Sequence, residues 1–576
     1  MSRQLMRAVF LSLSWFFFLR ILCSPDAAAQ TGWERDFAQI AVQDHGRKKP
    51  LTSFASESCL LLSGKQSLVL PNRGKMESLP LLLSLWLSPE GWEKEPILLV
   101  GEPLLREALG LPASRTRFSF DELKGNQALR ALTLRLGARE TAGDAQDSPQ
   151  ARLERALRGL TERMDLFSRI VSGEALTIVP EPEGTDGRWL SLPEAKAAYP
   201  PEVTAKLDLL WERMRAAVLS KNQREAGMAA SALAQELRSL NPSRYPDAGK
   251  LRFEETYREL RPWQWAWICY AASAISLALT AAWGRRIGYG LGWALALAGF
   301  LFQIYGFACR IVLAGRPPVT NMYESIIWVA FGVVFFALVL EAIYRSRYLL
   351  LAAMPIAVLC LLFVQTQPLI FDPSLQPLVP VLRNNFWLTV HVLSVTLSYA
   401  AFGLALGLGD LYLWRWLRLG SGRKRGEHVL AQYIYRCLQI GVFFLATGVV
   451  LGAVWANYSW GRFWDWDPKE TWALVALLCY LALLHGRIAG WWGELGLAAG
   501  SVLCFLSVLM AWYGVNFVLG KGLHSYGFGS GAVGPVAAFA LAQFLFVLWC
   551  GWAAWQRRGD GKGEAAPISA SEIGRS

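Results

Sequence analysis

The hydrophobicity of the chain changes sharply near residue 263. From there to residue 556, long apolar runs with few charges alternate with short polar connections. At a rise of about 1.5 Å per residue, each run is long enough for a helix to cross a hydrocarbon layer of about 30 Å. We predict transmembrane helices because lipid offers the backbone no hydrogen-bond partner. The nine predicted spans are approximately residues 263–283, 288–312, 324–343, 348–367, 386–413, 434–456, 470–487, 495–518 and 533–555.

Residues 30–262 have a different pattern, with charges throughout and no run that could cross a membrane. Apolar residues recur at steps of three and four from Leu153 to Phe167 and again from Leu207 to Val218, which predicts two amphipathic helices. Cys59 is the only cysteine of this region, so an internal disulfide is excluded. We predict a soluble, mainly helical extracytoplasmic domain over 30–262. The predicted fold class is an all-α polytopic membrane protein that carries this domain at its N-terminus.

The first 29 residues are typical of an export signal. Arg3 and Arg7 precede a short apolar run over 8–19, and three alanines at 27–29 offer a cleavage site. Residues 1–29 are therefore predicted to be a signal peptide or signal anchor. Either alternative directs the residues that follow across the membrane.

The distribution of basic residues agrees with a topology in which residues 30–262 lie outside the membrane. The net charge is +12, and only 18% of the residues are charged. If 30–262 lies outside, the inner connections and the tail at 557–576 hold fifteen basic residues, whereas the outer connections hold six. This asymmetry is the one expected of a membrane protein with its basic loops inside. We therefore predict no nucleic-acid partner.

The connection over 455–472 holds five of the 26 tryptophans, at 455, 460, 464, 466 and 472. Tryptophan is enriched at membrane interfaces, so an aromatic belt is one interpretation. The dense cluster, with charged residues such as Asp465 and Asp467 between the rings, equally favours a platform for a flat apolar ligand. Composition alone leaves both interpretations open.

Three of the five histidines suggest that the ligand is haem. His391 and His524 are predicted on the same side of the membrane as the tryptophans, where two imidazoles could bind iron from opposite faces. Hydrogen-bonded interfacial histidines are the alternative. His485 lies near the inner end of its span, about 22 Å from Glu470 along a straight helix, so a haem there would need a second site. His428 is expected to face solvent.

Several ordered motifs over about residues 290–530 resemble a known family. The segment from Trp460 to Trp472 is similar to the tryptophan-rich "WWD" motif of haem-handling proteins, and its Asp-Pro-Lys-Glu-Thr-Trp ending resembles the CcsA (ResC) branch of cytochrome c biogenesis system II. The stretches 316–325, 380–391 and 522–527 fit the same branch. The resemblance implies a transmembrane haem-handling domain over 263–556. It further implies that His391 and His524 ligate haem iron, that His485 is the histidine within the membrane, and that the haem contacts are Trp460, Trp464, Trp466 and Asp467.

The resemblance also implies the substrate, the partners and the location. The family exports haem b and attaches it to C-x-x-C-H motifs of secreted apocytochromes c, together with a ResB (CcsB) protein and a thiol-reducing partner, in the bacterial inner membrane. This chain departs from the pattern at Phe463, where Tyr is common, and no other span supplies a second membrane histidine. We expect that histidine to come from the ResB-like partner. The stretch 42–55 resembles the soluble region of extended members.

The function predicted from the sequence is haem translocation and presentation for covalent attachment to apocytochromes c. In that role the chain is the haem-ligating part of a cytochrome c synthase, and no catalytic side chain is expected. The sequence leaves two alternatives: an export protein that binds another amphipathic ligand, or a haem-handling protein of system I.

Overall fold

The computed structural model describes residues 32–138, 149–182, 187–283, 286–377, 384–419, 425–519 and 533–560. The chain divides into two compact units. Unit 1 consists of Met1–Trp265, Leu301–Pro318 and Gln365–Pro380, and unit 2 consists of Ala266–Phe300, Val319–Val364 and Val381–Ser576.

The predicted spans are present as long apolar helices. Within the described residues, nine helices are long and apolar enough to cross a membrane, which confirms the predicted polytopic fold class. The helices of this region are α14 (Pro262–Trp283), α15 (Arg286–Ala314), α16 (Met322–Tyr344), α17 (Tyr348–Thr366), α18 (Asn385–Trp387), α19 (Leu393–Leu419), α20 (Arg425–Trp460), α21 (Pro468–Ile488), α22 (Glu494–Leu509) and α23 (Val533–Asp560). Two π-helical segments, η3 (Leu388–Val392) and η4 (Met510–Leu519), precede α19 and follow α22.

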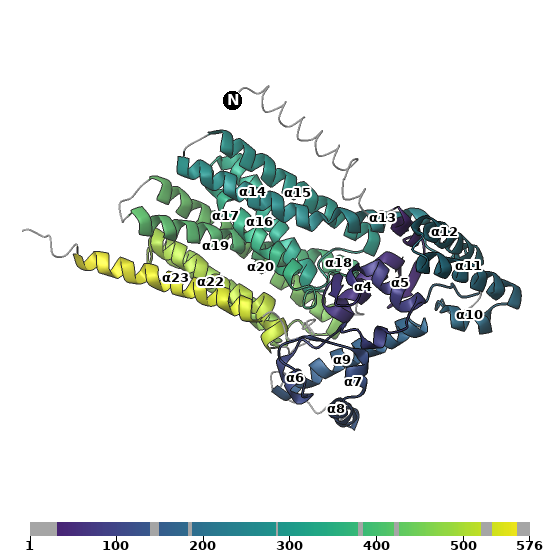
Figure 1. Ribbon diagram of the computed structural model, residues 1–576. Coiled ribbons are helices and arrows are strands. Elements are labelled where there is room, and N and C mark those ends of the chain that lie inside the picture. Colours follow the sequence, from purple (N-terminus) through teal and green to yellow (C-terminus); the bar gives the residue numbers. More distant parts are fainter. Residues whose placement is uncertain are drawn as a thin grey trace, which may run out of the picture. The chain divides into compact units, whose positions relative to one another are not determined.

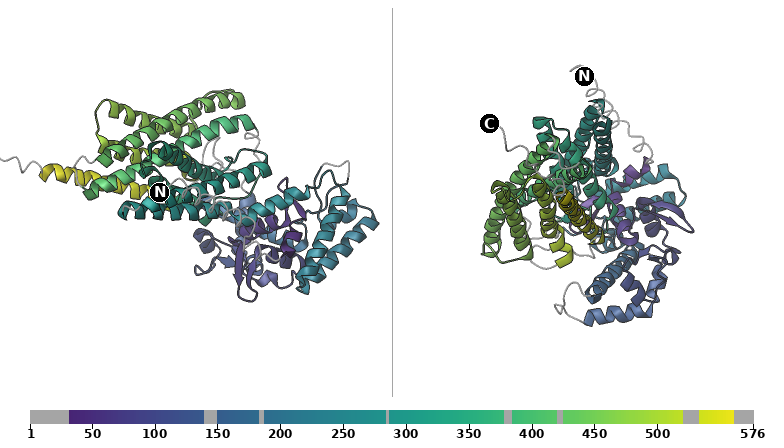
Figure 2. Two further views of the ribbon diagram at one scale, coloured as in Figure 1. Left: turned by 90° about the horizontal axis from the view of Figure 1, so that it is seen from above. Right: turned by 90° about the vertical axis from the view of Figure 1, so that its left-hand side faces the viewer.

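Helix α19 is central to unit 2. It packs against α16, α20 and α22, and these helices run alongside one another in the views of Figures 1 and 2. The most apolar windows of α16 and α19 are 67% buried, whereas that of α23 is only 11% buried. The outer helices therefore leave most of their apolar surface for lipid or another protein.

Unit 1 is mainly helical, with three two-stranded antiparallel sheets. Its strands are β1 (Ala41–Asp44), β2 (Arg47–Pro50), β3 (Ser67–Leu70), β4 (Gly74–Glu77), β5 (Leu98–Leu99) and β6 (Arg117–Phe118). Its helices before α14 are α3 (Trp33–Phe37), α4 (Leu51–Ser63), α5 (Ser78–Leu87), η1 (Trp92–Lys94), α6 (Pro103–Ala108), α7 (Phe120–Lys124), α8 (Gln127–Ala138), α9 (Pro149–Ser172), α10 (Leu192–Ala198), α11 (Pro201–Leu219), α12 (Gln223–Leu240) and α13 (Ala248–Leu260).

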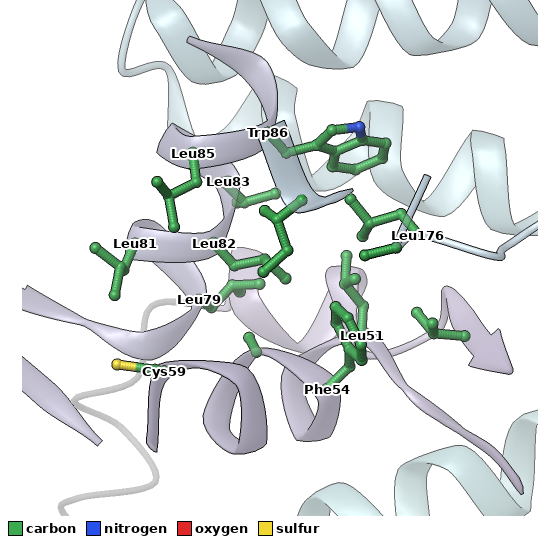
Figure 3. Close-up of a cluster of buried hydrophobic side chains, with 14 of the residues drawn as sticks. Leu51, Phe54, Cys59, Leu79, Leu81, Leu82, Leu83, Leu85, Trp86 and Leu176 are labelled. Carbon is green, nitrogen blue, oxygen red and sulfur yellow. The ribbon is translucent and has the colours of Figure 1, made fainter. Parts of the chain in front are cut away.

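The core of unit 1 forms where α4 and α5 face each other. Figure 3 shows Leu51 and Phe54 of α4 pointing toward Leu79 and Leu82 of α5. The predicted amphipathic helices at 153–167 and 207–218 are present as α9 and α11, and both bury apolar residues in the same core. Burial of this many leucines is the main stabilising contribution to the unit.

The stretch 42–55, which has no helical or strand periodicity, is a hairpin followed by α4. His45 and Gly46 form its turn with φ values of 47° and 79°, the left-handed pair that a tight two-residue hairpin requires. Lys49 Nζ lies 2.7 Å from Asp44 Oδ2 and also pairs with Glu57. Burial raises the pKa of Asp44, but the hydrogen bond from His45 and the charge of Lys49 outweigh it and hold that pKa well below its ordinary value. This polar cluster ties the hairpin to α4.

Candidate haem-binding site

A cavity in unit 2 lies where five helical elements and one loop meet. The start of α16, the turn η3 with α19, the end of α20, the loop before α21, the start of α21 and the segment η4 all contribute side chains. The lining residues used below are Asn321, Met322, Ser325, His391, Gly452, Trp455, Phe463, Trp464, Lys469, Glu470, Trp512 and Asn516. The cavity thus combines a histidine, four aromatic rings and a lysine.

His391 lines the cavity from the π-helical turn η3. Its Nδ1 lies 2.8 Å from the carbonyl oxygen of Gly448. Because a carbonyl can only accept, Nδ1 carries a proton, and in the neutral ring Nε2 is then the nitrogen that can bind a metal. Metal-binding histidines are commonly oriented in this way, with one ring nitrogen donating to a carbonyl and the other binding the metal. A π-helical turn at this position is also typical of functional sites.

Two glycines of α20 permit close approach here: Gly452 leaves room for His391, and Gly448 leaves room for Val395 of α19. A Cβ atom on Gly452 would lie 2.5 Å from His391 Cε1, so any larger residue would displace the ring. One turn further along α20, the ring of Trp455 meets the imidazole edge to face at 5.7 Å between centroids. The sequence analysis missed Gly448 and Gly452. Their spacing of four residues, one turn before a tryptophan, was the available signal.

The loop between α20 and α21 is held by the first turn of α21. Asp467 is the N-cap of α21 and accepts the backbone N–H of Lys469 at 2.9 Å. The Glu470 carboxylate accepts the N–H of Asp465 at 2.9 Å, and the Thr471 hydroxyl donates to the carbonyl of Trp466 at 3.2 Å. Trp466 itself has a φ of 56°, a left-handed conformation that costs free energy for a bulky residue.

The structure separates the predicted tryptophans. Trp464 lines the cavity, and its ring lies 5.9 Å from that of Trp466 in an edge-to-face arrangement. Trp466 is 69% exposed and is not part of the lining. Trp460 ends α20 and is half-buried outside the lining. Asp467 is buried beneath the loop, where it caps α21.

Comparison with known proteins identifies the family. Residues 319–524 match the family described as cytochrome C assembly protein. CcsA of Pyropia yezoensis is 31% identical over 306 residues, which cover 45% of this chain and 95% of that protein. CcsA of Guillardia theta is 35% identical over 246 residues, or 38% of this chain and 79% of that protein. The chain belongs to the CcsA family of cytochrome c biogenesis proteins. The predicted family is therefore confirmed.

A longer relative of this CcsA-family chain is NrfI of Wolinella succinogenes, 28% identical over 523 residues. The match covers 85% of this chain, so it extends beyond the membrane region into residues before 262. It covers 54% of NrfI, and the chain thus spans about half the length of that relative. Part of the region before residue 262 is accordingly shared with NrfI.

Residues 319–322 and Ser325, which belong to the stretch that resembles the family, line the cavity at the start of α16. Asn321 caps α16 by accepting the N–H of Glu324 at 2.8 Å, and Glu324 in turn accepts the N–H of Thr320 at 2.9 Å. Ser325, one residue further, accepts the indole N–H of Trp512 at 2.9 Å. These contacts hold the start of α16 against η4, so the motif has a structural role at the site.

Of the other two predicted haem ligands, the structure describes only His485. His524 falls outside the described residues. His485 is on the exposed face of α21, between Leu478 and Ile488, which are 55% and 72% exposed. Its Nδ1 donates to the carbonyl of Leu481 at 2.7 Å. About 24 Å of helix separates it from Lys469 at the cavity, so one haem cannot contact both positions.

Proposed function

We propose that this CcsA-family protein moves haem b across the membrane and holds it at the cavity for covalent attachment to the C-x-x-C-H motif of secreted apocytochromes c. The observation that carries the proposal is His391. Its ring is oriented by the Gly448 carbonyl, meets Trp455 edge to face, and lines a cavity together with Trp464 and other aromatic rings. A flat iron macrocycle matches that combination.

The chain contributes position rather than bond-making atoms. His391 binds the iron from one side, and His524 binds it from the other, as the family resemblance implies. Trp464 packs against the macrocycle from within the cavity, while Trp466 and Trp460 cover it from outside the lining. The apocytochrome thiols add to the haem vinyl groups, and its histidine then replaces one of the two ligands. In this sense the protein is the haem-ligating part of a cytochrome c synthase.

His485 receives the haem before it reaches the cavity. The exposed position of His485 leaves it open to a ligand from another membrane protein, which supports a ResB-like partner as the source of the second histidine. A thiol-reducing partner keeps the apocytochrome cysteines available for the reaction. With these partners, the proposed location is a bacterial inner membrane.

The proposed orientation puts the N-terminal domain and the cavity on the periplasmic side. The excess of basic residues in the alternate connections supports it. The connections that follow α15 and α17 also belong to the same compact unit as the N-terminal region. The same alternation of spans brings the loop between α20 and α21 to that side.

Haem spectra of the purified full-length protein test the proposal. We expect a Soret band with split α and β bands, the spectrum of bis-histidine haem, when the protein is produced in a haem-replete host. His391→Ala and His524→Ala should each weaken these bands. His428→Ala is the matched control because His428 is exposed and pairs with Glu494 away from the cavity. Colourless wild-type protein would refute the proposal.

Co-expression tests the final step. A C-x-x-C-H reporter should acquire covalent haem when this protein and a ResB-like partner are both present. Reporter that stays without haem, although the partner and the haem-loaded protein are present, would contradict the synthase role.

A further inference from the structure

Lys469 is a positively charged residue that lines the cavity and is not among the proposed haem contacts. Its side chain is half-buried and lines the cavity beside the aromatic rings. Its Nζ donates to Asn516 Oδ1 at 3.3 Å. Asn516 is neutral and 6% exposed, and its own Nδ2 donates to the carbonyl of Trp512 at 2.9 Å. The ammonium is thus held in place by an amide that cannot neutralise it.

The neighbouring carboxylates form hydrogen bonds with the backbone and do not pair directly with this ammonium. Asp467 accepts the backbone N–H of Lys469 as a helix cap, and Glu470 accepts the N–H of Asp465. The charge of Asp467 stabilises the ammonium from nearby, but in the part of the chain that the structure describes no carboxylate forms a direct ion pair with Lys469 Nζ. A partly buried ammonium gains from a direct carboxylate partner, which a ligand can supply.

Other features of the cavity favour an anionic group at the same place. Helices α16 and α21 both begin at the cavity, at Met322 and Pro468, so their positive ends face it. Trp464 also lines the cavity, and its buried Nε1–H has no acceptor among the described residues. A carboxylate could accept hydrogen bonds from the ammonium and, after a small ring movement, from the indole.

We propose that Lys469 binds a carboxylate of the ligand, which for haem is a propionate. The inference rests on the proposed function and adds a specificity-determining residue to it. The two propionates of haem lie on one edge of the macrocycle, and the vinyl groups lie on the other pyrroles. Holding the propionate edge at Lys469 fixes the rotation of the ring about the iron axis and turns the vinyl groups away from the cavity wall, toward incoming thiols.

Titration with haem and with haem dimethyl ester tests this site, because esterification removes the carboxylate charges but keeps the iron and the ring. The full-length protein carries His485→Ala as background so that only the external site responds. We expect haem to bind roughly 10- to 100-fold more tightly than the diester, the effect of a charge-assisted hydrogen bond. Lys469→Met should abolish this preference by weakening haem binding alone, and Lys469→Arg should restore most of it.

Asn516→Asp is a second variant, which keeps the lysine and offers it an internal carboxylate. It should weaken haem binding, leave diester binding unchanged and preserve the absorption spectrum. If Lys469→Met weakens haem and diester equally, or changes neither, the carboxylate site is wrong while the haem site stands. If the wild-type protein binds neither compound, the proposed function itself is refuted.

Discussion

The contacts of His391 determine what the cavity can bind. A histidine at a membrane interface is ordinarily a hydrogen-bonded polar residue, and the sequence alone allowed that interpretation. The Gly448 carbonyl, 57 positions away in the chain, assigns the proton to Nδ1, and the missing side chain of Gly452 leaves room for the ring. The donor nitrogen is thus prepared before any ligand arrives, which reduces the reorganisation that binding requires.

Gly452→Ala tests this arrangement. The added Cβ would lie 2.5 Å from His391 Cε1, so the imidazole must move and its hydrogen bond to Gly448 must lengthen. We expect haem affinity to fall by about tenfold or more, the equivalent of one lost interaction of about 1.4 kcal/mol, with a weaker bis-histidine spectrum. Gly551→Ala is the control because a Cβ there meets nothing within 4 Å. Equal spectra for both variants would contradict the role of Gly452.

The Asp44–Lys49 pair permits a stability prediction in unit 1. Lys49 is buried, with a side chain only 4% exposed, and Glu57 remains as its second partner. Asp44→Asn should therefore lower the free energy of unfolding by about 3 kcal/mol, the lower end of the range for a broken buried pair. Lys75→Gln is the control: it breaks the exposed ion pair between Lys75 and Glu77. This substitution should change the free energy of unfolding by less than about 1 kcal/mol.

The same pair makes the stability depend on pH. The pKa of Asp44 in the folded protein is held below the value of about 3.9 that it has in the unfolded chain. At pH values between these two pKa values the unfolded state binds more protons than the folded state, so stability falls as the pH is lowered. The advantage of wild type over Asp44→Asn should rise as His45 becomes protonated, be largest near about pH 5, and shrink as the pH falls below about 4. Thermal unfolding followed by tryptophan fluorescence measures both effects. An advantage that grew on acidification below about pH 4 would contradict the assigned pair.

At the scale of elements, α21 connects the two proposed haem positions. Its first turn holds the tryptophan loop and presents Lys469, and its last turn carries His485. The first turn can do this because Asp467, Glu470 and Thr471 bind backbone groups of the loop and of the helix start. Asp467, which the family resemblance implied as a haem contact, thus binds a backbone N–H of the helix start.

Asp467→Asn and Asp467→Ala separate a capping role from a charge effect on the ligand. Asparagine is as good an N-cap as aspartate, whereas alanine costs roughly 0.5–2 kcal/mol. We expect Asp467→Asn to retain most of the haem affinity and Asp467→Ala to weaken it, with faster amide exchange over residues 461–471. If both variants lost haem equally, the charge of Asp467 would be the important property.

At the scale of the whole molecule, the chain combines a cavity at the start of α21 with an exposed histidine near the end of the same helix. We expect His485→Ala to reduce the amount of haem at the cavity without changing its spectrum, because supply is impaired and ligation is not. The occupancy of protein purified together with its ResB-like partner measures this effect. Loss of one axial ligand from the external haem in this variant would show that the two-position route is wrong.

Much of this molecule could be predicted from the sequence because its main patterns are local. The nine spans agree with the observed helices to within a few residues at most ends, since an apolar run in lipid has only one way to satisfy its backbone. The amphipathic helices α9 and α11 follow from the spacing of their leucines in the same way. The family could be identified because its motifs are contiguous stretches of sequence.

The tertiary structure alone decided how the site works. Three features depend on contacts between segments far apart in the chain: which tryptophans line the cavity, which carbonyl orients His391, and the hydrogen bond of Lys469 to Asn516. A periodic pattern in the sequence indicates which side of a helix is apolar. It does not indicate which groups on different helices come into contact, because that depends on helix packing and on the few glycines that permit close approach.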